Sequence, residues 1–175
     1  MSLLLRFLGL SSGDESPGDS EAIRRIAGQL EGLGKDEARY LAGFAYVLAR
    51  VAHADMRMEE SERAEMRGAL EALGGLAPPE AALAVEIAER EAGHLGGSEN
   101  YLVTREFRRI SSREQRVALM ECLYAVAASD GSISTAESNE IVKIAEELGF
   151  SRGEAIALRG AWKEHLAEIQ ALRRS

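Results

Sequence analysis

An internal repeat with an offset of 75 residues constrains this chain more than any other feature of its sequence. When the chain is slid over itself by this offset, apolar, acidic and glycine positions coincide. The coinciding pairs include Leu48/Leu123, Val51/Val126, Ala52/Ala127, Asp55/Asp130, Glu62/Glu137, Leu73/Leu148 and Gly74/Gly149. Each half has a helix, a short acidic connection, a second helix and, after the glycine, a third. We therefore expect two helical units packed with approximate two-fold symmetry.

The spacing of apolar residues predicts an all-α fold. They recur every three or four positions, and alanine, leucine and glutamate dominate while threonine and valine are scarce. We expect helices over residues 20–32, 36–54, 59–74, 78–93, 99–110, 112–129, 134–148 and 152–172. Three of the starts carry a capping-box spacing, namely Ser112 with Gln115, Ser134 with Glu137 and Ser151 with Glu154.

The chain length of 175 residues suits one domain. We place this domain at residues 20–175, with one repeat over about 36–93, the other over about 112–170, and the 99–110 helix joining them. Residues 1–19 are interpreted as an N-terminal segment followed by a flexible tether rich in serine, glycine and acidic residues. Residues 1–10 could rest on a membrane or a partner, although packing on their own domain is the favoured interpretation.

Charge and composition exclude several function classes. The 21 basic and 29 acidic residues leave a net charge of −8, which argues against nucleic acid as a partner. One cysteine and three histidines provide no thiolate or imidazole cluster, so any metal chemistry would use carboxylate oxygens. No apolar run is long enough to span a bilayer, and we predict a cytoplasmic protein.

Four carboxylates extend apolar helix faces and are expected to point inward. Asp55 and Asp130 continue the apolar faces of the helices that precede them, and Glu62 and Glu137 begin the apolar faces of the next helices. A carboxylate removed from water needs a cation, helix-terminal amides or a proton. Glu65 and Glu140 lie one turn further on and are expected to be solvated, with an outer-ligand role as the alternative.

The segment from Asp130 to Glu137 matches the second half of an EF-hand calcium loop. The earlier ligand positions would fall on Val126 and Ala128, which cannot coordinate, so this half alone is not an EF-hand. The other repeat could supply the missing oxygens, in which case two half-sites would form one site. The alternative is structural, because Glu137 could simply complete the capping box of Ser134. Both interpretations stay open.

The repeated Ala-x-Asp pattern, the Asp-Gly-x-Ile-x-x-x-Glu connection from Asp130 to Glu137 and the following Leu-Gly stop resemble the tellurite-resistance TerB family and the TerB-like domain of some DnaJ-type co-chaperones. The resemblance covers residues 36–170. It implies a small all-helical protein whose acidic residues bind a divalent cation such as calcium, magnesium, manganese or zinc. Transferred to this sequence, the ligands are Asp130 and Glu137, and by the repeat Asp55 and Glu62. It also implies a role in tellurite resistance or stress response.

An enzyme is not expected, because the chain has no glycine-rich phosphate loop and no histidine cluster. We predict a non-enzymatic module that binds a cation and relays this to an unknown protein partner. The alternative is a metal-free interaction or co-chaperone-like domain that uses residues 1–10 or an arginine cluster as its contact. This cluster consists of Arg105, Arg108, Arg109 and Arg113, and it could dock an acidic partner or phosphate, although a solvated face is favoured.

The remaining aromatic and sulfur-containing side chains are assigned to the core. The aromatic residues at helical spacing with aliphatic neighbours are Tyr40, Tyr46, Tyr101, Tyr124 and Trp162. Cys122 lies on an apolar helix and is expected to be a small buried hydrophobe.

Overall fold

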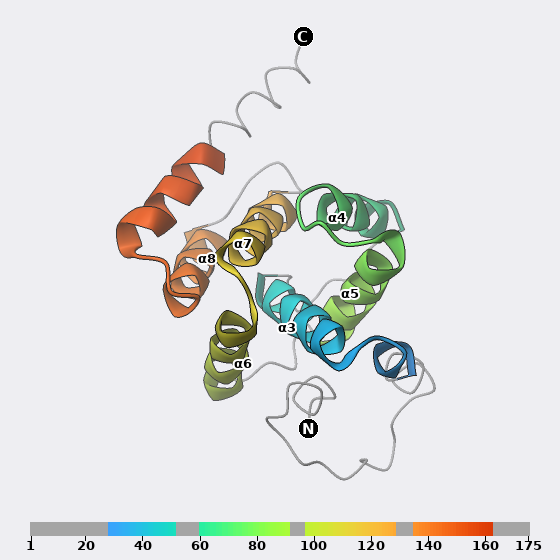
Figure 1. Ribbon diagram of the computed structural model, residues 1–175. Coiled ribbons are helices and arrows are strands. Elements are labelled where there is room, and N and C mark those ends of the chain that lie inside the picture. The colour runs from blue at the N-terminus through green and yellow to red at the C-terminus, as the bar shows by residue number, and fades with distance from the viewer. Residues whose placement is uncertain (1–27, 52–59, 92–96, 129–134, 163–175) are drawn as a thin grey trace.

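The computed structural model describes residues 28–51, 60–91, 97–128 and 135–162 (Figure 1). Every regular element in these ranges is an α-helix, and none is a strand, so the all-α prediction is confirmed. The labelled helices are α3 (Lys35–Val51), α4 (Glu60–Ala72), α5 (Pro78–Glu91), α6 (Gly97–Ile110), α7 (Arg113–Ala127) and α8 (Thr135–Glu147). Residues 28–31 and 152–162 are also helical.

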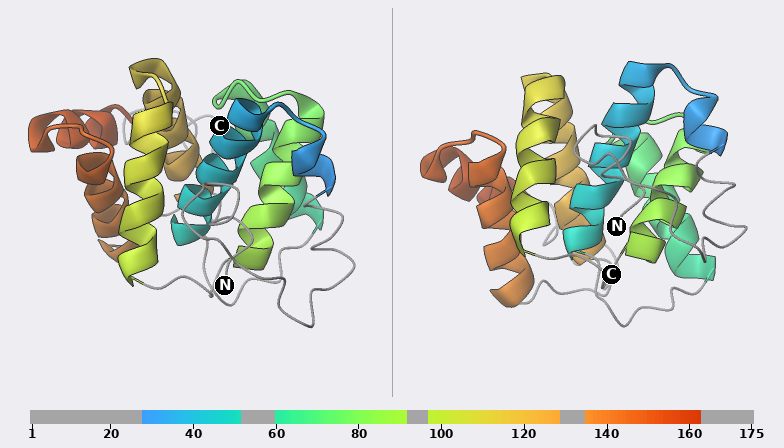
Figure 2. Two further views of the ribbon diagram at one scale, coloured as in Figure 1. Left: turned by 60° about the horizontal axis from the view of Figure 1, so that its bottom comes forward. Right: turned by 90° about the horizontal axis from the view of Figure 1, so that it is seen from below.

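Helix α3 is the centre of the fold. Every residue from Leu41 to Ala49 is buried, so this stretch has no face turned to water. A helix that is apolar all round must be covered on every side, and α5, α6, α7 and α8 all pack against α3. Figure 1 shows α3 in the middle of the other labelled helices, and in Figure 2 it lies alongside α5 and α6.

Aromatic side chains join neighbouring helices in this core. Tyr40 and Phe44 of α3 pack against Phe107 of α6, with ring centroids 5.4 and 6.3 Å away. Tyr124 of α7 stacks on Trp162 with centroids 6.4 Å apart, which ties the last described helix to α7. Four of the five aromatic residues assigned to the core therefore pack inside the fold.

The prediction for the fifth aromatic residue is wrong. Tyr101 is 51% exposed, and its neighbour Leu102 is 37% exposed. The face of α6 that packs on α3 instead carries Val103 and Phe107, which are fully buried. The guanidinium of Arg105 covers the Tyr101 ring at 5.9 Å, so this ring serves as a platform on the surface.

The helix bounds follow the 75-residue offset of the sequence. Helices α4 and α8 each have 13 residues, and Glu60 and Ala72 correspond to Thr135 and Glu147. The packing crosses between the halves, because α3 contacts α8 and α4 contacts α7. Each half thus packs its first helix against the second helix of the other half. Two-fold symmetry in space remains a prediction.

Two of the three predicted capping boxes are present. At the start of α7 the amide of Gln115 donates to Oγ of Ser112 at 3.1 Å, and the amide of Ser112 donates to Oε1 of Gln115 at 2.8 Å. Ser151 and Glu154 make the same reciprocal bonds at 3.1 and 2.7 Å. The third box includes Ser134, which lies outside the described residues.

Glycines end α4 and α8, as predicted, but in different ways. Gly149 has a φ of 92°, the left-handed conformation that stops a helix with little strain only at glycine. After α4 it is Gly75, with φ of 67°, that takes this conformation. Gly74 is needed for space, because a Cβ there would lie 2.6 Å from the carbonyl oxygen of Leu70 and 3.2 Å from Sγ of Cys122.

Candidate functional site

Glu137 is the one predicted ligand whose side chain the structure describes. It lies in the first turn of α8 and is 8% exposed, on the same inward face as Ile141 and Ile144, which are fully buried. A carboxylate at this position faces the free amides and the positive end of the helix dipole, which favour negative charge. The helix itself therefore offsets part of the desolvation cost of this carboxylate.

The other three predicted ligands are not brought together by what the structure describes. Asp55 and Asp130 lie outside the described residues. Glu62 is the third residue of α4, as Glu137 is of α8, but its side chain is also outside the described part. Within the described ranges no group of three or more histidine, cysteine, aspartate or glutamate side chains is arranged to hold a metal ion.

A buried arginine is the strongest polar feature in the core. The side chain of Arg50, in the last turn of α3, is only 1% exposed. Its Nη2 and Nε donate to Oε1 of Glu140 at 2.6 and 3.0 Å. Its Nη1 donates to Oε2 of Glu147 at 2.6 Å and to Oγ1 of Thr104 at 2.8 Å. We call this set the Arg50 cluster; it ties α3 to α6 and α8.

The Arg50 cluster corrects the expectation for Glu140. This carboxylate is not a freely solvated charge, because two guanidinium nitrogens of Arg50 donate to its Oε1. Glu140 is 32% exposed and Glu147 is 11% exposed, so the pair neutralises Arg50 at the edge of the core. Glu65, its counterpart in the first repeat, is exposed as predicted.

Sequence reasoning overlooked Arg50, although one signal was present. The nine residues before it form an apolar run that is buried on all sides, and a charge at the end of such a run must be paired. Glu140 and Glu147 are seven residues apart and so share one face of α8. The partners lie 90 and 97 positions along the chain from Arg50, which is why no local pattern identifies them.

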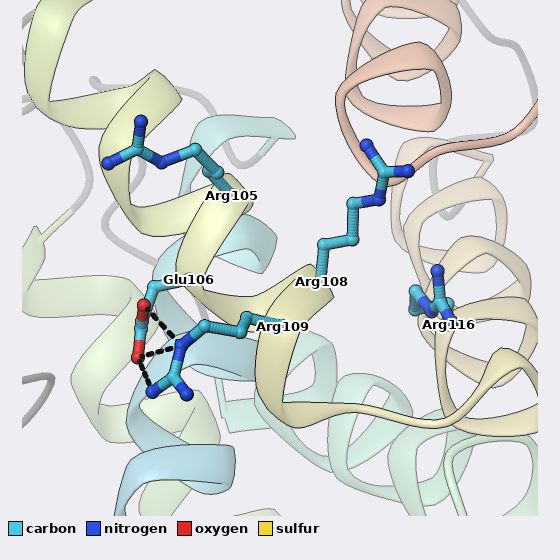
Figure 3. Close-up of a pocket in the computed structure, with 5 residues that line it drawn as sticks. All are labelled: Arg105, Glu106, Arg108, Arg109 and Arg116. Carbon is cyan, nitrogen blue, oxygen red and sulfur yellow. Dashed lines mark hydrogen bonds and ion pairs between the residues drawn. The ribbon is translucent and has the colours of Figure 1, made fainter.

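Three of the four arginines of the predicted cluster line one cavity, and Arg116 lines it in place of Arg113. Arg105, Arg108 and Arg109 of α6 line a cavity of about 690 Å³ together with Glu106 and Arg116 (Figure 3). Arg113 is not among the lining residues. It pairs with Glu154 at 2.7 Å and covers the Phe150 ring at 5.2 Å.

Cys122, Tyr40 and Glu106 have shifted pKa values with clear causes. Burial raises the pKa of the Cys122 thiol to about 12, so the thiol stays protonated at neutral pH and is a poor nucleophile. Burial also raises the pKa of Tyr40 to about 12. At the cavity, the hydrogen bond from Arg109 lowers the pKa of Glu106, which keeps this carboxyl ionised.

None of the helices in the described ranges has the length and apolar character needed to cross a membrane. No curated protein and no solved structure matches this chain. The sequence profile of the tellurite resistance protein TerB family does match, over residues 41–160, which is more than half of the 175 residues and runs from within α3 into the last described helix. This chain therefore belongs to the TerB tellurite resistance family.

Proposed function

We propose that this protein is a non-enzymatic helical module of the cytoplasm that binds a divalent cation through Asp55, Glu62, Asp130 and Glu137. Its occupancy by the cation would be read by a protein partner in tellurite resistance or stress response. The observation that carries the proposal is the burial of Glu137 in the first turn of α8, at the position that corresponds to Glu62 in the equally long helix α4.

The matched register of α4 and α8 supports a shared role for the four carboxylates. Asp55 and Asp130 each precede the next helix by five residues, and Glu62 and Glu137 are each the third residue of that helix. Hard divalent cations take their ligands from carboxylate and carbonyl oxygens, and calcium takes six to eight of them. Two acidic connections offer more oxygens than one, which favours a site that draws on both halves.

The Arg50 cluster supports a way of relaying the bound state. It holds the end of α3 against α8, and Asp55 follows α3 by only four residues. A cation held by Asp55 and Glu137 would act on the same two helices that Arg50 joins. Glu140 and Glu147 each already have Arg50 as a cationic partner. Binding would thus act at the ends of the helices that Arg50 already joins.

Thermal denaturation tests the proposal directly, because a ligand that binds only the native state raises the melting temperature. The full chain is stripped with EDTA and then melted with calcium, magnesium, manganese or zinc. We expect at least one ion to raise the melting temperature and Glu137→Gln to remove most of this rise. Glu146→Gln is the matched control, because Glu146 lies on the exposed face of the same helix. If no cation has an effect, the cation proposal fails.

The second candidate is a metal-free protein-interaction or co-chaperone-like domain. It is favoured by Tyr101 and Leu102, neighbouring residues of α6 that are both exposed, since adjoining exposed apolar side chains can form part of a contact surface. The two functions are separated in cells that lack the protein and are exposed to tellurite. Under the cation proposal Glu137→Gln fails to restore growth, whereas under the interaction proposal Tyr101→Ser fails and Glu137→Gln succeeds.

A further inference from the structure

The cavity between α6 and α7 is lined mostly by arginines. Its lining has four arginines and one carboxylate, in a chain whose overall charge is −8 (Figure 3). This cavity is a pocket that is widely open to solvent, and its volume of about 690 Å³ lies in the range of sites that hold small organic ligands. Like charges are gathered here against their mutual repulsion, so an anion in the cavity would relieve that repulsion.

Arg108 is held in place by the turn that ends α8. A Cβ at Gly149 would lie 2.7 Å from Nε and 2.8 Å from Cζ of Arg108, so the guanidinium lies directly on the glycine backbone. Arg108 makes no hydrogen bond or ion pair with any residue in the described ranges. In Figure 3 its guanidinium extends from α6 toward this turn. Its donors are therefore positioned by packing and remain available to a ligand.

Arg116 is anchored at the same turn from the other helix. Its Nη1 donates to the carbonyl oxygen of Leu148 at 3.1 Å, and its Nε donates to the carbonyl oxygen of Ser112 at 3.2 Å. These bonds fix the half-buried side chain, and its Nη2 makes no bond within the described part of the chain. Immobilised side chains lose little further conformational entropy when they bind.

Glu106 pairs with Arg109, another arginine that lines the cavity. Its carboxylate accepts from Nε of Arg109 at 3.1 Å on both oxygens, so Arg109 is occupied by a partner within α6. Arg105 also lines the cavity, but it lies over the Tyr101 ring, and in Figure 3 its guanidinium extends away from those of Arg108 and Arg116. The cavity therefore has two anchored cations, one outlying cation and one cation that its own carboxylate neutralises.

We propose that this cavity binds a phosphate-bearing anion, with Arg108 and Arg116 as the principal donors. The planar guanidinium presents paired N–H groups that match phosphate oxygens, and ionised donors and acceptors form the strongest hydrogen bonds. The cavity is larger than one phosphate group requires, so a ligand with two linked phosphates should bind more tightly than one with a single phosphate. This site is separate from the four carboxylates of the proposed cation site and stands or falls independently of them.

Isothermal titration calorimetry of the full chain with inorganic phosphate and pyrophosphate, at constant ionic strength, tests the proposal. We expect saturable one-site binding, with pyrophosphate the tighter ligand. Arg108→Gln and Arg116→Gln should each weaken pyrophosphate binding at least tenfold. Glu106→Gln should strengthen it several-fold, because it removes the opposing charge and releases Arg109. This gain keeps the test decisive if Arg116→Gln, which loses the bond to Leu148, folds poorly in a thermal melt.

Arg67→Gln on α4 is the matched control, because it removes the same charge at an arginine that does not line the cavity. The affinity of Arg67→Gln for pyrophosphate should stay within twofold of that of the parent protein. An equal loss in Arg67→Gln and Arg108→Gln would overturn the proposal, since it would reflect net charge alone. Cosedimentation with phosphatidylcholine vesicles containing phosphatidic acid distinguishes a lipid headgroup from a soluble phosphate compound. Absence of binding to pyrophosphate and to these vesicles would also overturn it.

Discussion

Replacing Arg50 should destabilise the fold, because its buried guanidinium pairs with two carboxylates of α8. Arg50→Met keeps an unbranched apolar stem but leaves Glu140 and Glu147 without their cation. Removing one partner of a buried ion pair destabilises a protein by several kcal/mol, so we expect the free energy of unfolding to fall by about 3 kcal/mol. Urea denaturation at pH 7 measures this change.

Two further variants test the cause of that loss. The triple variant Arg50→Met, Glu140→Gln, Glu147→Gln should regain most of the stability, because no unpaired charge is left. Arg67→Met breaks a surface pair with Glu60, which is 73% exposed, and should leave the free energy of unfolding unchanged within error. A similar loss for Arg50→Met and Arg67→Met would show that the Arg50 cluster contributes no more than a surface pair.

Because of Cys122, we expect the free energy of unfolding to change with pH in the alkaline range. Its thiol has a pKa of about 12 in the folded protein against an ordinary value of 9.0. Below pH 9 the thiol is protonated in both states. Above that pH the unfolded chain releases the proton while the folded chain retains it, so unfolding becomes easier as the pH rises toward 12.

We therefore expect the free energy of unfolding to fall between pH 9 and pH 10.5, and to fall less steeply in Cys122→Ala. Urea titrations at several pH values measure both slopes. Tyr40, whose pKa is also raised to about 12, contributes the same trend from pH 10 upward and explains a residual slope in the variant. Identical slopes in the two proteins would mean that the thiol is not shielded from water.

At the scale of helices and turns, Gly149 links the end of α8 to the arginine cavity. Gly149→Ala forces a side chain into a left-handed conformation, which costs about 1–2 kcal/mol, and also pushes its Cβ into the Arg108 guanidinium. Gly75→Ala imposes a similar backbone cost with nothing within 4 Å of the added Cβ. We expect Gly149→Ala to be the more destabilising in urea denaturation.

Removing the Arg108 guanidinium tests whether its contact with Gly149 causes the difference between the two alanine variants. In an Arg108→Ala background the guanidinium is gone, so the difference between Gly149→Ala and Gly75→Ala should disappear. If the difference persists, the contact between Arg108 and Gly149 is not its cause. Arg108 would then lie away from the turn, and its packing could not orient it toward a ligand.

Helix positions were predictable because their signals are local. The Ser112–Gln115 box starts α7, Pro78 starts α5, and the register of α4 and α8 follows from the repeat. The first two signals depend on residues within a few positions of one another, and the third can be seen by comparing the two halves of the sequence. The exposure of Tyr101 was not predictable in this way, because it depends on which face of α6 meets α3.

For the molecule as a whole, the features to which we assign a proposed role depend on contacts between distant segments. The inward position of Glu137 followed from the apolar face of α8, so the burial of this carboxylate could be predicted from the sequence. The pairing of Arg50 with α8 could not, because it requires the crossing of α3 and α8. The presence of Arg116 in the arginine cavity, in place of the expected Arg113, could not be predicted either. The two residues lie about one helical turn apart, and the packing of α7 decides which of them lines the cavity.

The crossed packing of the two halves leads to a prediction about stoichiometry. Helix α3 packs on α8 and α4 on α7, so each acidic connection follows a helix that is held against the other half. If the carboxylates of both halves serve one cation, the chain binds one ion, and Glu62→Gln should weaken binding as strongly as Glu137→Gln, at least tenfold each. Equilibrium dialysis followed by elemental analysis gives both numbers. Two ions per chain, with each substitution removing one of them, would instead mean that the half-sites act separately and that the repeat duplicates a weak site without completing it.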